Sequence, residues 1–164
     1  MGHWPGEKRA SLPILSDASG YLLRGMALSM LVLHAAAEAG IRRHARESYP
    51  YECCGALIGC NQVVSEAFAL PNTTEEGPRR RFLIRPVDYQ AAELRATELG
   101  AELLGFYHSH PDSPAEPSQY DLDHAWPVFA YVILAVTAGK PAALTSWRLR
   151  EDRLAFDEQP VTVE

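Results

Sequence analysis

The sequence predicts an α/β domain with a mixed, mostly antiparallel sheet flanked by helices on both sides. Strand-like apolar runs alternate along the chain with stretches of helical periodicity, as expected when helices pack on a sheet. The run FAYVILAV at 129–136 is apolar throughout, which indicates a strand buried on both faces. A chain of 164 residues suits one hydrophobic core. We expect a flexible extension over 1–25 and a single domain over 26–164.

The first half of the domain contains a predicted strand, a helix and a hairpin. A strand is expected over 26–31, followed by an amphipathic helix that runs to residue 48. The segments CCGALIGC (53–60) and VVSEAFAL (63–70) have the apolar and β-branched composition of two hairpin strands. A polar loop with Pro-Asn and Gly-Pro turn signals follows at 71–80.

The second half begins with a predicted helix over 87–103. Its apolar face would carry Val87, Ala91, Leu94, Ala101 and Leu104, and Gly105 would end it. The remaining predicted elements are a strand in GFYHSH (105–110), a short helix after Ser118 that Pro127 curtails, the buried strand 129–136, and two paired strands at 144–150 and 153–159.

Composition and charge exclude several classes of function. Apolar residues make up 47% of the chain and charged residues 22%, which is typical of a soluble globular protein. A net charge of −6 argues against nucleic acid as a partner. The basic runs at 42–46 and 79–81 are interpreted as solvated surface. No apolar run is long enough to cross a bilayer, so we expect no membrane association.

The cysteines indicate a reducing compartment. Cys53, Cys54 and Cys60 are odd in number and too closely spaced for a disulfide framework, and they form no zinc-knuckle pattern. We expect small buried thiols and a cytoplasmic protein.

The segment HSHPDSPAEPSQYD at 108–121 carries most of the functional information. Side chains alternate along a strand, so His108 and His110 point the same way while Ser109 points to the opposite face. Two imidazoles joined by the carboxylate of Asp121 outline a three-ligand zinc site with an open position. Taken alone, however, a His-x-His pair is as often an ordinary polar pair in a strand.

Helix capping offers an alternative explanation of the second part of the segment. Ser118 occupies a predicted N-cap and Asp121 the third helical position, and this arrangement needs no metal. A capped turn also fixes the direction of a ligand, so capping and metal binding are compatible. Four further side chains are spare ligand candidates at this stage: Asp112, Glu116, Asp123 and His124.

A zinc hydrolase also needs a proton acceptor. Zinc lowers the pKa of a bound water towards neutrality, and a nearby carboxylate can then take the proton and return it to the leaving amine. The candidate is Glu52 in YPYECCGALIG, directly before the first hairpin strand. Considered alone, Glu52 would be interpreted as a surface glutamate at a strand start.

These residues together resemble the JAMM (MPN-plus) metalloprotease family. ECCGALIG, then H-S-H, seven residues, S, two residues and D reproduce its motif, and the similarity extends over roughly 28–158. The resemblance implies an MPN/JAB fold of cytidine-deaminase-like architecture and makes 26–164 the catalytic domain. It also implies one zinc ion per chain and the following roles: His108, His110 and Asp121 as zinc ligands, Glu52 as general base, Ser118 as oxyanion stabiliser, and Ser109 as a buried residue between the ligands.

The resemblance further implies a substrate class. Family members hydrolyse amide or isopeptide bonds after the C-terminal tail of ubiquitin or a ubiquitin-like protein. Short bacterial versions resemble peptidases that act after the terminal Gly-Gly of a sulfur-carrier protein. The intervals 60–108 and 111–144 leave little room for the long insertions of polyubiquitin-specific enzymes, so we favour the sulfur-carrier peptidase over a deubiquitinase-like isopeptidase.

Two other classes of protein remain as alternatives. A cupin-like oxygenase also uses His-x-His and a carboxylate, but it needs a later strand histidine and an all-β barrel. A non-catalytic zinc-containing binding module would close its coordination sphere, most simply with His124. The apolar residues of the extension, among them Ile14 and Leu22, would serve as a homodimer arm, dock on the domain, or stay disordered.

Overall fold

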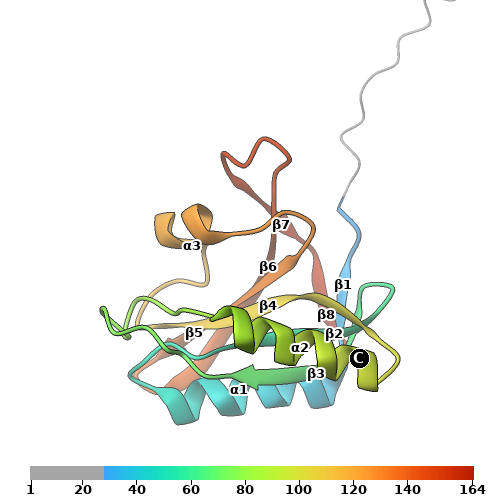
Figure 1. Cartoon of the computed structure of the whole chain (residues 1–164). Helices are drawn as coiled ribbons and strands as arrows, with labels where there is room; N and C mark the ends of the chain where they lie inside the picture. The colour runs from blue at the N-terminus through green and yellow to red at the C-terminus, as the bar shows by residue number, and fades with distance from the viewer. Residues whose placement is uncertain (1–27) are drawn as a thin grey trace, which may run out of the picture.

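The computed structural model describes residues 28–164, which form one eight-stranded sheet with helices on both faces (Figure 1). The predicted extension over 1–25 and the start of the predicted strand 26–31 lie outside the described residues. The elements are, in chain order, β1 (Leu31–Leu33), α1 (Ala35–Ser48), β2 (Cys54–Cys60), β3 (Val63–Leu70), α2 (Pro86–Glu98), β4 (Glu102–Pro111), α3 (Gln119–His124), β5 (Ala130–Thr137), β6 (Lys140–Leu149), β7 (Phe156–Gln159) and β8 (Val161–Val163).

The sheet is mixed and mostly antiparallel, as predicted. Its strand order is β7-β6-β5-β4-β2-β3-β1-β8. The pairs β4–β5, β1–β3 and β1–β8 are parallel, and β2–β3, β2–β4, β5–β6 and β6–β7 are antiparallel. The predicted hairpin is confirmed as β2 and β3, whereas β8 was not predicted. β4 and β2 therefore occupy the centre of the sheet.

Each face of the sheet has its own core, and the two histidines of β4 lie on the same face. Tyr107 belongs to the core cluster that contains Ala37 and Ile41 of α1, while Phe106 belongs to the cluster that contains Ala92 of α2. Because side chains alternate along β4, His108 and His110 share the face of Phe106, and Ser109 shares the face of α1. Figure 1 shows α1 and α2 on different sides of the sheet.

Helix α2 differs from the prediction in length and in the face that it buries. Val87 and Leu94 are exposed, and the buried positions are Asp88, Ala92 and Ala96. The prediction followed the larger apolar residues, but small alanines allow the helix to approach the sheet closely. Helix α2 ends five residues earlier than predicted because Gly100 adopts a positive φ of 62° and lets the chain turn into β4.

Gly105 lies inside β4 and does not end a helix. A Cβ atom there would lie 2.0 Å from the carbonyl oxygen of Ala130, so only glycine permits this approach of β4 to β5. Among the cysteines, Cys53 and Cys54 are buried as expected, but Cys60 is exposed because it ends β2 beside the hairpin turn. Within residues 28–164, no helix combines the length and apolarity needed to cross a membrane.

Candidate metal centre

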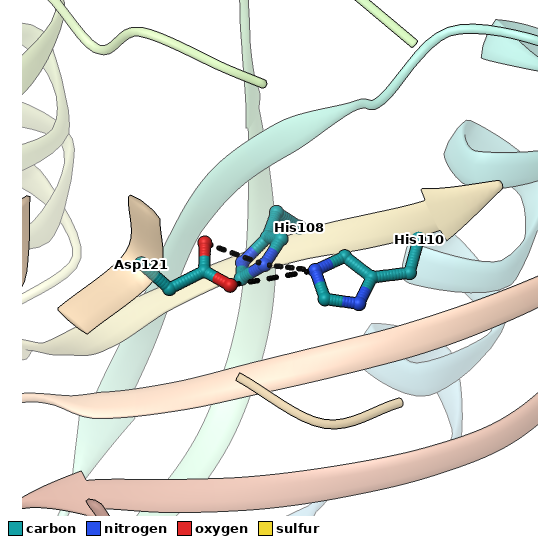
Figure 2. A group of neighbouring side chains, drawn as sticks. All are labelled: His108, His110 and Asp121. Atoms are coloured by element: carbon teal, nitrogen blue, oxygen red, sulfur yellow. Dashed lines mark hydrogen bonds and ion pairs between the residues drawn. The ribbon is translucent and has the colours of Figure 1, made fainter. Parts of the chain in front are cut away.

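Three of the predicted site residues meet at the end of β4 (Figure 2). Nε2 of His108 lies 3.0 Å from Nε2 of His110 and 3.2 Å from Oδ1 of Asp121. Nε2 of His110 lies 3.5 Å from Oδ2 of Asp121. All three side chains are buried, with 1%, 6% and 8% of each residue exposed, so the group is screened from bulk water.

The capping box of α3 directs the carboxylate of Asp121 towards the histidines. The backbone N–H and the hydroxyl of Ser118 each donate to Oδ2 of Asp121 at 2.7 Å. The backbone N–H of Asp121 donates in return to Oγ of Ser118 at 3.1 Å. The predicted cap is therefore confirmed, and it holds the carboxylate with two hydrogen bonds to Oδ2 while leaving Oδ1 to face His108.

The two imidazoles are oriented by different contacts. Nδ1 of His110 lies 2.8 Å from the carbonyl oxygen of Pro114 and donates to it, which leaves the lone pair of Nε2 facing His108 and Asp121. The ring of His108 stacks on Phe82, with centroids 4.6 Å apart and an interplanar angle of 28°. Nδ1 of His108 has no hydrogen-bond partner among the described residues, so stacking is what orients this ring.

The electrostatics of the group favour a neutral imidazole beside an ionised carboxylate. Burial lowers the pKa of His108, against the opposing charge of Asp121. Burial also lowers the pKa of His110, but hydrogen bonds with Asp121 and Pro114 outweigh it and raise the pKa overall. Burial on its own raises the pKa of Asp121, yet the neighbouring histidines and the Ser118 amide hold it well below its usual value.

The donor set fits a zinc ion. Two imidazole nitrogens and one carboxylate oxygen converge from rigid elements, and three protein ligands are typical of a catalytic zinc that keeps one position open. The spare candidates lie elsewhere: Nδ1 of His124 contacts the carbonyl oxygen of Tyr120, and Asp123 accepts from Gln119. Asp112 accepts from the Tyr49 hydroxyl and the Ala138 amide, and Glu116 is exposed.

Glu52 is buried beside this group, although the residue considered alone would be interpreted as a surface glutamate. Only 5% of the residue is exposed, and burial raises its pKa to about 8, with opposing effects from the charges of His110 and Asp121. The register pairs Cys54 with His108, and the Ser109 N–H donates to the Cys53 carbonyl at 3.1 Å. Glu52 therefore lies at the level of His110.

A hydrogen bond from the backbone to a side chain holds the segment that carries Glu52. Oγ of Ser109, which is fully buried, accepts the Cys53 N–H at 2.9 Å. In a regular ladder the Cys53 N–H would bond to a backbone carbonyl. Ser109, which lies between the two histidines of β4, thus holds Cys53, the residue next to Glu52, by a hydrogen bond.

A cavity of about 300 Å³ adjoins the group on the side of Phe106. His108 and Asp121 form part of its wall, whereas Glu52 and His110 do not. Aromatic side chains supply much of the remaining wall: Phe82, Phe106, Tyr120, Trp126, Tyr131 and Phe156. Space for an apolar group therefore lies directly beside the three convergent side chains.

The structure brings the five predicted site residues close together, and it adds two partners that the sequence did not indicate. Phe82 stacks on His108 from a loop far away in the chain, and no periodic pattern connects these two positions. Pro114 was not among the predicted site residues, although its carbonyl oxygen orients His110. A carbonyl acceptor leaves no signature in the sequence, because every residue has one.

A mixed sheet that presents two histidines, an aspartate and a buried glutamate at one end defines a JAB/MPN-type domain. The model of the family described as prokaryotic homologs of the JAB domain matches residues 34–150, a range that contains all five predicted site residues. The chain belongs to this family.

Three relatives have names that describe an activity. A desampylase of Haloferax volcanii is 36% identical over 115 residues, which cover 66% of this chain and 82% of the relative. A CysO-cysteine peptidase of Mycobacterium tuberculosis is 30% identical over 144 residues, covering 87% and 97%. A probable TtuB-protein conjugate cleaving protease of Thermus thermophilus is 36% identical over 93 residues, covering 56% and 61%. These names support a hydrolase.

The fold is also found among solved structures. The solution structure of a protein from Desulfitobacterium hafniense superposes with a TM-score of 0.72 at 28% identity, covering 82% of this chain and 93% of that one. The arrangement of strands and helices described above is therefore shared with a structure determined by experiment.

Proposed function

We propose that this protein is a zinc-dependent peptidase or isopeptidase that hydrolyses the amide bond after the C-terminal Gly-Gly tail of a ubiquitin-like sulfur-carrier protein. One observation carries the proposal: the buried convergence of His108, His110 and Asp121 beside Glu52. A buried acid next to a ligand set suits metal-assisted amide hydrolysis, because a water must lose a proton and the leaving amine must gain one.

The protein side chains divide the work as follows. His108, His110 and Asp121 would hold one zinc ion, which when bound lowers the pKa of water and polarises the scissile carbonyl. Glu52 takes a proton from the attacking water and returns it to the leaving amine. In the metal-free protein, burial raises the pKa of this carboxyl to about 8, and the positive charge of a bound zinc ion would lower it again, towards the range in which a carboxylate can accept a proton at neutral pH.

Ser118 is proposed to stabilise the oxyanion. Its hydroxyl donates to Oδ2 of Asp121, and the residue as a whole is exposed at the N-terminus of α3. Rotation about one side-chain bond would redirect this hydroxyl, while the Ser118 N–H would keep its own bond to the carboxylate. A single donor of this kind typically contributes about a hundredfold to a thousandfold in kcat.

The substrate class rests on the names of the relatives and on chain length. One relative is named for a protein joined to a single cysteine, and another for a conjugate of two proteins. In both names, the bond to be cleaved joins a carrier protein to another group. The coverage of 97% of the CysO-cysteine peptidase favours the single amino acid adduct, with a deubiquitinase-like isopeptidase as the alternative. The free cysteines favour a cytoplasmic enzyme.

The test uses zinc-loaded protein, zinc analysis and a fluorogenic peptide amide that ends in Gly-Gly. Glu52→Gln is expected to keep one zinc per chain and to lower kcat by at least about a hundredfold. Glu116→Gln, an exposed glutamate of the loop before α3, serves as the control and keeps full activity. Failure to bind zinc, or a Glu52→Gln variant as fast as wild type, would contradict the proposal.

The non-catalytic alternative makes a different prediction for His124. If His124 closed a structural site, His124→Ala would lose the metal. Its Nδ1 contacts the carbonyl oxygen of Tyr120 and its ring stacks on Tyr120 at 4.1 Å, outside the three convergent residues. We therefore expect His124→Ala to retain zinc and activity.

A further inference from the structure

Three consecutive arginines lie beside the candidate site of an otherwise acidic chain. Arg79, Arg80 and Arg81 are all exposed, in a protein whose net charge is −6. A run of this kind is ordinarily solvated surface. Here the loop between β3 and α2 that carries the three arginines also contacts Glu52 and His108, so the run has a specific position relative to the site.

Both ends of the segment 78–82, here named the arginine segment, are attached to the site. At one end, the carbonyl oxygen of Pro78 accepts the Glu52 N–H at 2.8 Å. At the other end, the Tyr120 hydroxyl donates to the carbonyl oxygen of Phe82 at 3.2 Å, and the Phe82 ring stacks on His108. The arginine segment therefore runs from the proposed base to the helix that carries Asp121.

One side chain fixes the middle of the segment. The amide nitrogen of Asn72 donates to the carbonyl oxygens of both Glu52 and Arg81, each at 3.0 Å. These contacts use backbone atoms and leave the guanidinium groups on the outside. The segment is thus held at the site by its backbone and by Phe82, while it presents positive charge to the solvent.

Two of the three guanidinium groups are available to a partner. Arg81 pairs with Glu76 at 3.3 Å and lies over the ring of Tyr120 at 5.4 Å. Neither Arg79 nor Arg80 forms an ion pair within residues 28–164. Arg79 has a longer-range favourable interaction with Asp112, and both guanidinium groups remain free to contact a further carboxylate.

We propose that the arginine segment is a docking surface for acidic residues of the protein whose tail enters the site. This inference rests on the proposed function. The chain is acidic overall, and this segment places positive charge directly beside the site, so it would orient the encounter with an acidic partner there. Guanidinium groups also bind carboxylates bidentately, which gives them an advantage over lysines for this task.

The experiment compares fluorogenic Gly-Gly amides with different upstream residues. Three peptides carry glutamates, serines or lysines ahead of an identical Gly-Gly amide, and KM and kcat are measured at low and high salt. We expect the glutamate peptide to have a KM about tenfold below that of the lysine peptide at low salt, with equal kcat. The two values should converge in about 1 M salt, where the Debye length is about 3 Å.

The variant Arg79→Glu/Arg80→Glu is expected to reverse the order of the two peptides. Arg43→Glu/Arg46→Glu is the matched control, because it makes the same charge change on exposed positions of α1, across the sheet from the site. This control should keep the preference for glutamate. Equal KM values for the three peptides in wild type, or an equal loss of preference in the control, would overturn the proposal.

A binding measurement separates this inference from the proposed function. Fluorescence anisotropy of the labelled glutamate and lysine peptides on the zinc-loaded Glu52→Gln variant reports docking without cleavage. Tighter binding of the glutamate peptide supports the docking surface even if no peptide is cleaved by wild type, an outcome that would contradict only the proposed function. Equal binding of both peptides refutes the docking surface even if cleavage occurs.

Discussion

Replacement of Glu52 by glutamine is expected to stabilise the metal-free protein while it abolishes activity. Burial raises the pKa of this carboxyl from 4.5 to about 8, so the folded state binds its proton more tightly than the unfolded state does. The stability linked to this group is fully present below pH 4.5 and is lost as the pH rises towards 8.

The size of the effect follows from the two pKa values. The cost of ionising Glu52 in the folded state is about 1 kcal/mol at pH 5, about 3 kcal/mol at pH 7 and about 5 kcal/mol at pH 9. Glutamine has no proton to lose. The difference in unfolding free energy between Glu52→Gln and wild type should therefore grow by about 4 kcal/mol between pH 5 and pH 9.

Urea unfolding in the presence of a chelator measures this difference. Wild type, Glu52→Gln and the control Glu75→Gln, an exposed glutamate of the loop 71–80, are compared at the three pH values. The control should follow wild type throughout. Parallel pH profiles of wild type and Glu52→Gln would show that the carboxyl is not buried as the structure has it, and the argument for a tuned acid would be refuted.

Substitutions at three further positions test the residues that support the site. Asp121→Asn should lose zinc, because a neutral amide is a poor ligand; retention of one zinc per chain by elemental analysis would contradict the ligand assignment. Ser118→Ala should lower stability by about 1 kcal/mol through the lost cap and lower kcat by about a hundredfold, whereas Ser118→Thr keeps the cap and the stability, as thermal unfolding would report. Ser109→Ala leaves the buried Cys53 N–H without its acceptor and should cost about 1–3 kcal/mol in urea unfolding; no measurable loss would mean that the N–H finds another partner.

The parts of the structure that local patterns describe could be predicted from the sequence. Alternation along β4 puts His108 and His110 on one face, and the cap places Asp121, because both depend on residues a few positions apart. Glu52 was a candidate proton acceptor from its place before the first hairpin strand, but only the family resemblance favoured it over a surface glutamate, since its burial depends on a loop that no local pattern describes. The stacking of Phe82 on His108 was not predictable for the same reason.

The face of α2 shows a different limit of prediction. Val87 and Leu94 are larger and more apolar than Ala92 and Ala96, so periodicity weighted by hydrophobicity favours the wrong side of the helix. What decides the face is how closely the helix backbone can approach the sheet, and that depends on small side chains. The distance between the helix backbone and the sheet cannot be derived from the composition of the helix alone.

The position of Asp121 on a helix of six residues has a consequence for how metal affinity and local order are linked. His108 and His110 belong to a central strand, but Asp121 belongs to α3, which is joined to the loop before α2 by the Tyr120 hydroxyl. So short a helix opens more readily than the strand does. A metal ion that binds residues of both elements must also hold α3 in its closed position. The measured metal affinity is therefore lower by the free energy of ordering α3. Hydrogen exchange at α3 should slow far more upon metal binding than exchange in β4.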